Sequence, residues 1–266
     1  MKIKQILFAA LCSIALLSSC KKDKTTEPPV DYTDEQLGVQ ADKILHYSFN
    51  GSLDDESGNN LMATYPNNVT YTADRFGRPD HAIVFGGSSN MTTLATPSPK
   101  PFITGMPFSI SIWFKATAVS TSQTLVKADG GEYNTYSGYW LQLGAVAPGT
   151  MSFSIGNNSA NNSTARNTIT TPAVFTAGNW YHVVVNVRGA NDMDFYINGV
   201  KNTSCSYDGS ATAMVFCSQQ NQQLGVMGVF MGVGSIFEGV MDDYRIYKKA
   251  LSQEEVSALY NFHPQQ

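Results

Sequence analysis

The chain has 266 residues, of which only 14% are charged, and its formal net charge at pH 7 is −4. This acidic balance lacks the basic footprint of proteins that bind nucleic acids, so we expect no nucleic-acid partner. Apart from the N-terminal run, no apolar stretch of the sequence approaches the length that spans a membrane.

The N-terminus has the layout of a secretory signal. In MKIKQILFAALCSIALLSSC, two lysines precede an apolar run that is too short to cross a bilayer. The run ends in LSSC, which resembles the bacterial lipobox, and the resemblance implies that Cys20 carries a lipid. Residues 1–20 are therefore predicted to be a lipoprotein signal peptide. The protein would be an outer-membrane lipoprotein of a bacterial cell envelope, and whether it faces the periplasm or the surface stays open. The alternative is an ordinary signal peptide that ends in a chance cysteine.

Residues 21–40 are polar and charged, contain a Pro-Pro pair and predict a flexible tether. The rest, residues 41–266, is predicted to form one domain. Two cysteines remain in this domain, Cys205 and Cys217, and an even pair in an exported chain predicts a disulfide. The alternative is a pair of buried free thiols.

Most of the domain shows strand patterns. The segment 107–116 alternates apolar and polar residues, and 151–156 repeats this pattern. The segment 180–187 is apolar on both faces, as in a strand at the centre of a sandwich. The segment 193–200 alternates and then turns at Asn198-Gly199, a strong hairpin signal, because both central residues of a type I′ turn need φ > 0. The spacing predicts a sandwich or jelly roll.

The last segment predicts a helix. Ser252 and Glu255 have the spacing of a capping box, and Leu251 and Val256 occupy the two positions of a hydrophobic staple. This helix is expected to pack on the sandwich and to end the domain.

Five stretches occur in this order: LHYSFNGSLDDESGNN, DRFGRPDHAIVFGG, FSISIWFKA, WYHVVVNV with DFYINGV, and FEGVMDDYRIYKKALSQEEV. Together they resemble the laminin-G-like branch of the concanavalin A-like lectin/glucanase superfamily. The resemblance covers Asp42 to Tyr260. It implies an all-β jelly-roll sandwich of two antiparallel sheets with a short C-terminal helix. It also implies that the first and last strands lie side by side, which would bring FNG near MDDYRIY.

The adjacent residues Asp242 and Asp243 raise the question of catalysis. Glucanases of this superfamily carry E-x-D-x-x-E along one strand, and this chain has no such pattern. Neighbouring residues of a strand point to opposite faces, so we expect that the two aspartates cannot act on one substrate. The protein is therefore predicted not to be an enzyme.

The resemblance implies a structural Ca²⁺ instead. Its ligands would be Asp242 and the carbonyls of Asn50 and Gly51, because Ca²⁺ binds carboxylate and carbonyl oxygens. Asp55 is a further candidate ligand, and the alternative for Asp55 is an Asx turn.

A third interpretation treats the two aspartates as structural. They would then hydrogen-bond to neighbouring backbone, or pair with Arg245 and Lys248. The sequence leaves the three interpretations open.

Aromatic side chains mark a candidate site for a glycan. The stretch GGEYNTYSGYW offers Tyr133, Tyr136, Tyr139 and Trp140, and Trp113 alternates away from the apolar face of its strand. Sugars bind to exposed aromatic rings flanked by polar groups, so Tyr136 and Trp140 are the first candidates. The alternative is that these aromatic rings fill the core.

These observations predict a lipid-anchored cell-envelope protein whose domain binds a polysaccharide or another glycan without catalysis. The alternative is a protein-interaction or adhesion module of the same fold. A glycoside hydrolase is the third candidate. The ligand and the oligomeric state stay open.

Overall fold

The computed structural model describes residues 42–61, 63–64, 69–86, 91–93, 103, 105–128, 135–160, 165–215, 222–225 and 235–263. The predicted signal peptide with Cys20, the tether, Tyr133 and Cys217 lie outside the described residues. Within the described residues, no helix is long and apolar enough to cross a membrane.

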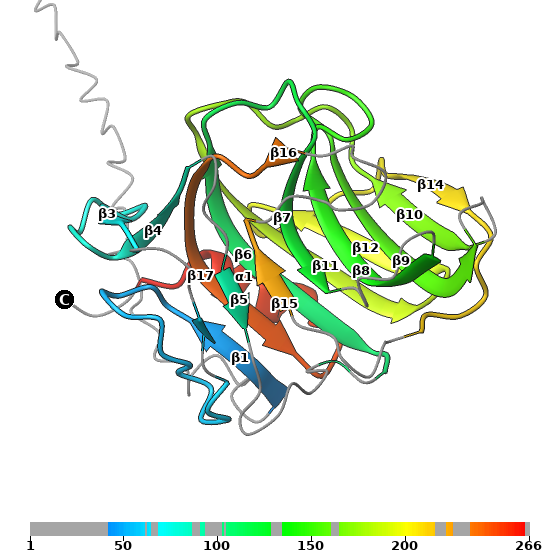
Figure 1. Cartoon of the computed structure of the whole chain (residues 1–266), viewed down its shortest axis with the longest axis horizontal. Coiled ribbons are helices and arrows are strands. Elements are labelled where there is room, and N and C mark those ends of the chain that lie inside the picture. The colour runs from blue at the N-terminus through cyan, green and yellow to red at the C-terminus, as the bar shows by residue number, and fades with distance from the viewer. Residues whose placement is uncertain are drawn as a thin grey trace, which may run out of the picture.

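The described strands form two sheets, as predicted (Figure 1). The first sheet has the order β13-β12-β11-β6-β17-β4-β3, with β1 paired to β17. Its strands are β1 (Lys43–Tyr47), β3 (Tyr71–Thr72), β4 (Ala82–Phe85), β6 (Phe108–Ala116), β11 (Trp180–Gly189), β12 (Asp192–Ile197), β13 (Val200–Lys201) and β17 (Gly239–Tyr247). All of its pairings are antiparallel.

The second sheet has the order β14-β10-β9-β8-β7-β15-β5-β2, with β16 paired to β7. Its strands are β2 (Ala63–Thr64), β5 (Met91–Thr93), β7 (Gln123–Ala128), β8 (Thr135–Leu143), β9 (Met151–Ala160), β10 (Arg166–Thr170), β14 (Ser206–Gly209), β15 (Gln222–Leu224) and β16 (Ser235–Ile236). The β16–β7 pair is parallel, and the other pairs of this sheet are antiparallel. The prediction of an all-β sandwich is confirmed.

The core lies between the sheets and follows the predicted alternation. The apolar residues of β6 are buried against those of β8 and β9, and rings such as Phe108, Tyr139 and Phe153 contact one another. Burying a side chain of this size stabilises the fold by about 1.5–3 kcal/mol. The hairpin between β12 and β13 also agrees with the sequence, because Asn198 and Gly199 both have positive φ.

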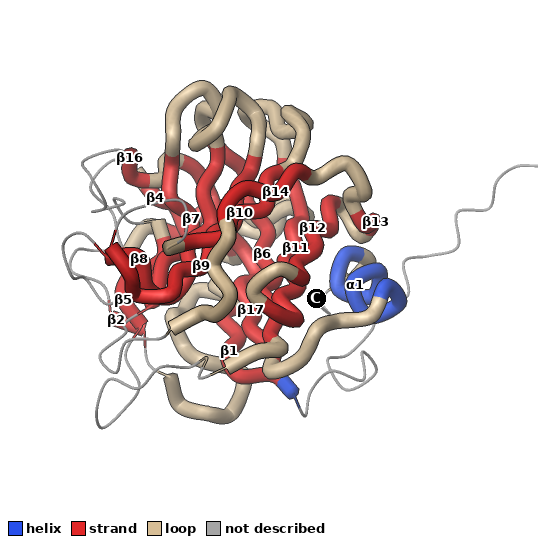
Figure 2. Tube along the Cα trace, turned by 90° about the vertical axis from the view of Figure 1, so that its right-hand side faces the viewer, coloured by secondary structure: helices blue, strands red, loops and turns tan. Residues whose placement is uncertain are grey.

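The helix α1 (Gln253–Tyr260) covers the outer face of the first sheet. Figure 2 shows α1 beside β11, β12 and β13, on the side away from β8 and β5. Val256 and Leu259 of the helix pack with Leu251 and with Val184 of β11. The strand β11 is apolar on both faces for this reason. The predicted capping box between Ser252 and Glu255 is present.

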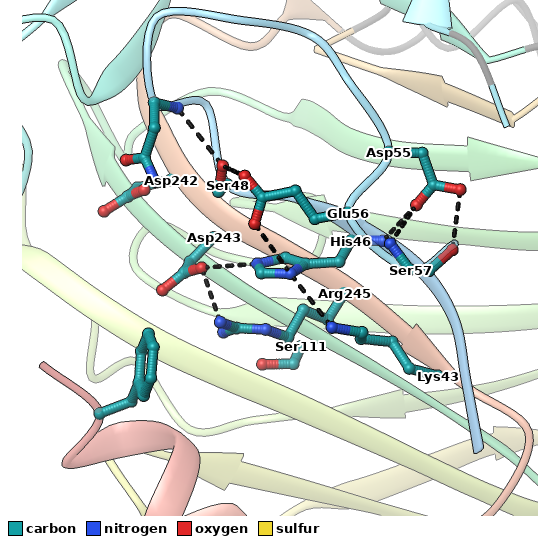
Figure 3. Close-up of polar contacts among 12 residues, drawn as sticks. Lys43, His46, Ser48, Asp55, Glu56, Ser57, Ser111, Asp242, Asp243 and Arg245 are labelled. Carbon is teal, nitrogen blue, oxygen red and sulfur yellow. Dashed lines mark hydrogen bonds and ion pairs between the residues drawn. The ribbon is translucent and has the colours of Figure 1, made fainter. Parts of the chain in front are cut away.

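The two ends of the domain meet at the first sheet. β1 pairs with β17, with His46 opposite Arg245 and Tyr47 opposite Tyr244. The proximity that the resemblance implied is therefore confirmed, and it brings His46 and Ser48, which precede the FNG segment, into one region with the Asp242-Asp243 pair (Figure 3).

Candidate functional site

A row of polar residues crosses the outer face of the second sheet. The register of the strands aligns its members from β7 through β8, β9 and β10 to β14: Lys127, Trp140, Ser154, Thr168 and Asp208. Trp140 and Ser154 are each flanked in sequence by core residues, so the row faces away from the core. We call these five residues the polar row.

Hydroxyl groups of this face bond to each other. The Oγ of Ser154 lies 2.8 Å from Oγ1 of Thr168, and the Oγ of Ser152 lies 3.1 Å from Oγ1 of Thr170. All four residues are buried. These pairs stabilise the sheet and make its outer face polar.

Two larger side chains stand among these hydroxyls. The indole of Trp140 is half-buried, and Gln142, two residues along β8, is half-buried as well. Gln142 donates from Nε2 to Oγ1 of Thr124 at 3.3 Å. An aromatic ring beside an amide and hydroxyls is the combination that sugars require, because the ring meets the apolar face of the sugar and the polar groups meet its hydroxyls.

The other aromatic candidates are placed differently. Tyr139 is 1% exposed and stacks on Phe153 in the core, so it has no surface for a ligand. Burial raises the pKa of its hydroxyl far above the ordinary value. Tyr136 belongs to β8, but its side chain is not among the described ones. Tyr133 lies outside the described residues.

Trp113 lies on the outer face of the first sheet, as its alternation predicted, but it is 7% exposed. The ring stacks between neighbours of α1 and β11: its centroid is 5.5 Å from that of Tyr260 and 5.1 Å from that of His182. Trp113 is therefore not an exposed binding residue, because the C-terminal helix covers this face.

His182 lies beneath the helix with Ser111. Its Nε2 is 2.9 Å from the Ser111 Oγ, and both residues are almost fully buried. Burial, reinforced by the charges of Arg75 and Arg245, lowers the pKa of His182 to about 3. The imidazole is thus neutral, and its burial beneath α1 indicates a structural role. The Ser111 hydroxyl is out of reach of a substrate.

The two aspartates of β17 point to the same side of the sheet. The strand has a bulge between Asp242 and Arg245, and Asp243 has φ +53°, a left-handed conformation. Both carboxylates contact the guanidinium of Arg75. The expectation of opposite faces was wrong, because it assumed regular strand geometry.

Asp243 is the centre of a buried ionic network (Figure 3). Its Oδ1 lies 3.0 Å from Nε2 of His46 and 2.9 Å from a terminal nitrogen of Arg245, and its Oδ2 lies 2.8 Å from Arg75. Burial alone would raise the pKa of Asp243, but Arg245, Arg75 and His46 together hold that pKa well below its usual value. The prediction that an aspartate pairs with Arg245 is confirmed.

His46 stays neutral within this network. Burial and the charge of Arg245 lower its pKa. Because the Asp243 carboxylate only accepts, the Nε2 of His46 carries the proton between them. Its Nδ1 lies 3.4 Å from Nζ of Lys43 and 3.5 Å from a carboxylate oxygen of Glu56.

The pKa of Asp242 shifts in the opposite direction from that of Asp243. Asp242 is 2% exposed and contacts Arg75, while burial and the charge of Asp243 raise its pKa to about 8. The sequence reasoning missed Arg75 as a partner. Arg75 lies in the DRFGRP stretch that the resemblance includes, but nothing in the local sequence pattern connects that stretch to β17.

The residues do not fit the calcium site that the resemblance implied. Asp55 accepts four hydrogen bonds: at Oδ1 from the backbone N–H groups of His46 (3.0 Å) and Ser57 (2.9 Å), and at Oδ2 from the Ser57 hydroxyl (2.7 Å) and the Leu61 N–H (3.0 Å). Asp55 therefore forms the Asx-turn alternative.

Asn50 and Gly51 form an exposed turn, in which the Gly51 N–H donates to the Phe49 carbonyl at 2.8 Å. The Asp242 carboxylate faces a guanidinium. In the part of the chain that the structure describes, no three His, Cys, Asp or Glu side chains are grouped to hold a metal ion.

Cys205 is half-buried, and its Sγ lies 3.6 Å from Oδ1 of Asn202. The predicted disulfide with Cys217 is not seen, and Cys217 lies outside the described residues, so their pairing stays a prediction. Burial and the charge of Asp194 raise the pKa of the Cys205 thiol to about 11.

Comparison with solved structures supports the fold. Domain 4 of an extracellular arabinanase from Geobacillus stearothermophilus, solved in complex with arabinotriose, is 22% identical with a TM-score of 0.59. The alignment covers 82% of this chain and 98% of that domain. The binding domain of botulinum neurotoxin serotype D is 14% identical with a TM-score of 0.62, over 84% of this chain and 52% of that domain.

The binding domain of botulinum neurotoxin DC, solved in complex with SialylT, is 16% identical with a TM-score of 0.59, over 84% of this chain and 52% of that one. This chain thus spans about half of the neurotoxin binding domains. No curated protein matches the chain.

The family comparison agrees with the two-sheet architecture. A family model described as the concanavalin A-like lectin/glucanases superfamily matches residues 85–257, which include most of both sheets and part of α1. The chain belongs to the concanavalin A-like lectin/glucanases superfamily.

Proposed function

We propose that this protein is a non-catalytic glycan-binding module, and that the outer face of its second sheet is the binding surface. The observation that carries the proposal is Trp140, the aromatic ring of the polar row, which is half-buried between Lys127 and Ser154, both of them buried. Strand register fixes these side chains, so the surface is preorganised for a ligand.

The chemistry of this face favours a carbohydrate over a protein. The indole of Trp140 supplies a ring for the apolar face of a sugar, while Gln142 and Asp208 supply an amide and a carboxylate for its hydroxyls. Within the polar row Trp140 and Asp208 are accessible to a ligand, whereas Lys127, Ser154 and Thr168 are buried beside them. The related arabinanase domain was solved with arabinotriose and a related neurotoxin domain with SialylT. This supports the ligand class by analogy of fold.

The sequence also predicts where in the cell the protein would act. A lipid on Cys20 would anchor the protein at the outer membrane, and residues 21–40 would give the domain reach. The protein would then capture polysaccharide at the cell envelope. The lipid supplies the membrane contact, so the folded domain needs no membrane-binding surface of its own.

The test is a glycan array and gel retardation by polysaccharides, including arabinans, with residues 21–266. Trp140→Ala removes the ring of the polar row. Trp180→Ala is the matched control, because Trp180 is also half-buried but belongs to β11 of the first sheet and contacts Lys115. We expect Trp140→Ala to weaken binding by about two- to tenfold, because a stacking contact contributes about 0.5–1.5 kcal/mol, and Trp180→Ala to bind as wild type.

Equal binding by both variants would place the ligand elsewhere on the protein. A negative result across plant, host and microbial glycans would instead favour the protein-interaction module, and partners in the cell envelope would then be sought.

A further inference from the structure

The superfamily resemblance implies a divalent cation between the ends of the domain, and the structure places an arginine there. Asp242 and Asp243 lie on the outer face of β17, where Arg75, from the turn between β3 and β4, contacts both carboxylates. The guanidinium supplies a positive charge at this position, and its two terminal nitrogens each contact one carboxylate.

The surroundings of Arg75 are built for a buried cation. Its side chain is 4% exposed, and its Cζ lies 4.5 Å from the ring centroids of Trp113 and Phe76. Aromatic faces attract cations, most strongly where water is excluded. A terminal nitrogen of Arg75 also lies 3.4 Å from the carbonyl oxygen of Phe262, at the C-terminal end of the domain.

These contacts tie three distant parts of the chain together. Arg75 is 167 residues from Asp242 and 187 from Phe262 in sequence. The turn that carries it is itself held by Asp74, whose carboxylate accepts from the backbone N–H groups of Phe76 (2.8 Å) and Arg78 (2.9 Å). A metal that bridged the chain ends would make the same kind of link.

We propose that the guanidinium of Arg75 takes the place of a structural divalent cation, and that the folded domain is therefore independent of calcium. A planar guanidinium with several donors suits this task, because it bonds two carboxylates at once. A lysine ammonium is a point charge and makes the same bridge less well.

The test measures metal content and thermal stability of residues 21–266 without reference to any ligand. Wild-type protein is expected to carry no stoichiometric calcium by elemental analysis, and its melting temperature is expected to be equal in chelator and in calcium. Arg75→Met keeps the length of the side chain and removes its charge. We expect this variant to melt lower than wild type and to be stabilised by added calcium, which then can bind the Asp242 carboxylate and the Oδ2 of Asp243, both left without Arg75.

Two controls separate the cation role from a general loss of contacts. Arg75→Lys should melt between wild type and Arg75→Met. Arg188→Met removes an arginine that pairs with Asp192 and Asp194 on the exposed β11–β12 hairpin, and it should show no response to calcium.

Calcium bound to wild type, or a lower melting temperature of wild type in chelator, would overturn the proposal. So would an Arg75→Met variant that folds and ignores calcium. If Arg75→Met does not fold, the metal content of wild type and its melting temperature in chelator decide whether the proposal stands. A glycan-binding result of either kind leaves this outcome unchanged, so the two proposals fail separately.

Discussion

Asp243 and His46 are 197 residues apart in sequence, yet Oδ1 of the first lies 3.0 Å from Nε2 of the second. The contact joins β17 to β1, and both side chains are buried. Because Arg75 and Arg245 also contact Asp243, one carboxylate contacts two arginines and a histidine at the junction of the chain ends.

The two adjacent aspartates should therefore differ in their effect on stability. Asp243→Asn leaves Arg245 and Arg75 buried without their shared anion, and breaking a buried pair costs about 3–5 kcal/mol. Asp242→Asn should cost less, because burial and Asp243 raise the pKa of Asp242 to about 8, so its charge is costly to hold in the fold. Urea denaturation of residues 21–266 measures both free energies of unfolding. A larger loss for Asp242→Asn would contradict this network.

The lowered pKa of His182 predicts that acid lowers the free energy of unfolding of the domain. That pKa is lowered from 6.5 to about 3, first by burial and then by Arg75 and Arg245, while Asp243 opposes the shift. Between these two pKa values, His182 binds a proton in the unfolded chain but not in the folded chain. The stability that this group contributes is present above about pH 6.5 and is lost as the pH falls toward about 3.

His182→Gln removes this titration and keeps a polar group beside Ser111. The free energy of unfolding of wild type should fall more steeply than that of the variant between about pH 6.5 and about pH 4. Urea denaturation across this range measures the difference. NMR of wild type should show the His182 ring as neutral down to about pH 5. Parallel pH curves for the two proteins would refute the assignment.

The capping box offers a local test of α1. The side chain of Ser252 accepts from the Glu255 N–H, and a Glu255 carboxylate oxygen accepts from the Ser252 N–H at 2.8 Å. Ser252→Ala should lower the free energy of unfolding by about 1 kcal/mol, and Ser252→Asp should restore most of it, because Asp also caps helices. An unchanged stability of Ser252→Ala would mean that packing of Val256 and Leu259 alone holds the helix.

Local patterns predicted the elements that local chemistry controls. The alternation in β6 marks its core face, Asn198-Gly199 marks a hairpin, and Ser252 with Glu255 marks the start of α1. Each of these signals depends on residues within a few positions of one another, so one sequence is enough to read them.

Contacts between distant segments could not be read in the same way. The pairing of Arg75 with β17 depends on a bulge at Asp243 and on the meeting of two segments that the sequence keeps far apart. Trp113 was placed on the correct face, but its burial depends on α1 packing there. For Tyr139 the signal was available, because it alternates with Trp140 and shares the face of Leu141, which lies in the core.

Lipidation of Cys20 is the prediction that decides where the domain works. The mature protein should carry lipid on Cys20, because the cysteine follows LSS at the end of the apolar run. Cells that express the full chain are labelled with a radioactive fatty acid, and the purified protein is measured for label. Cys20→Ala should abolish the label, and Cys12→Ala is the matched control, because Cys12 lies within the signal and its replacement should leave the label intact. Label that persists in Cys20→Ala would overturn the anchor and leave the domain without the membrane attachment that capture at the envelope requires.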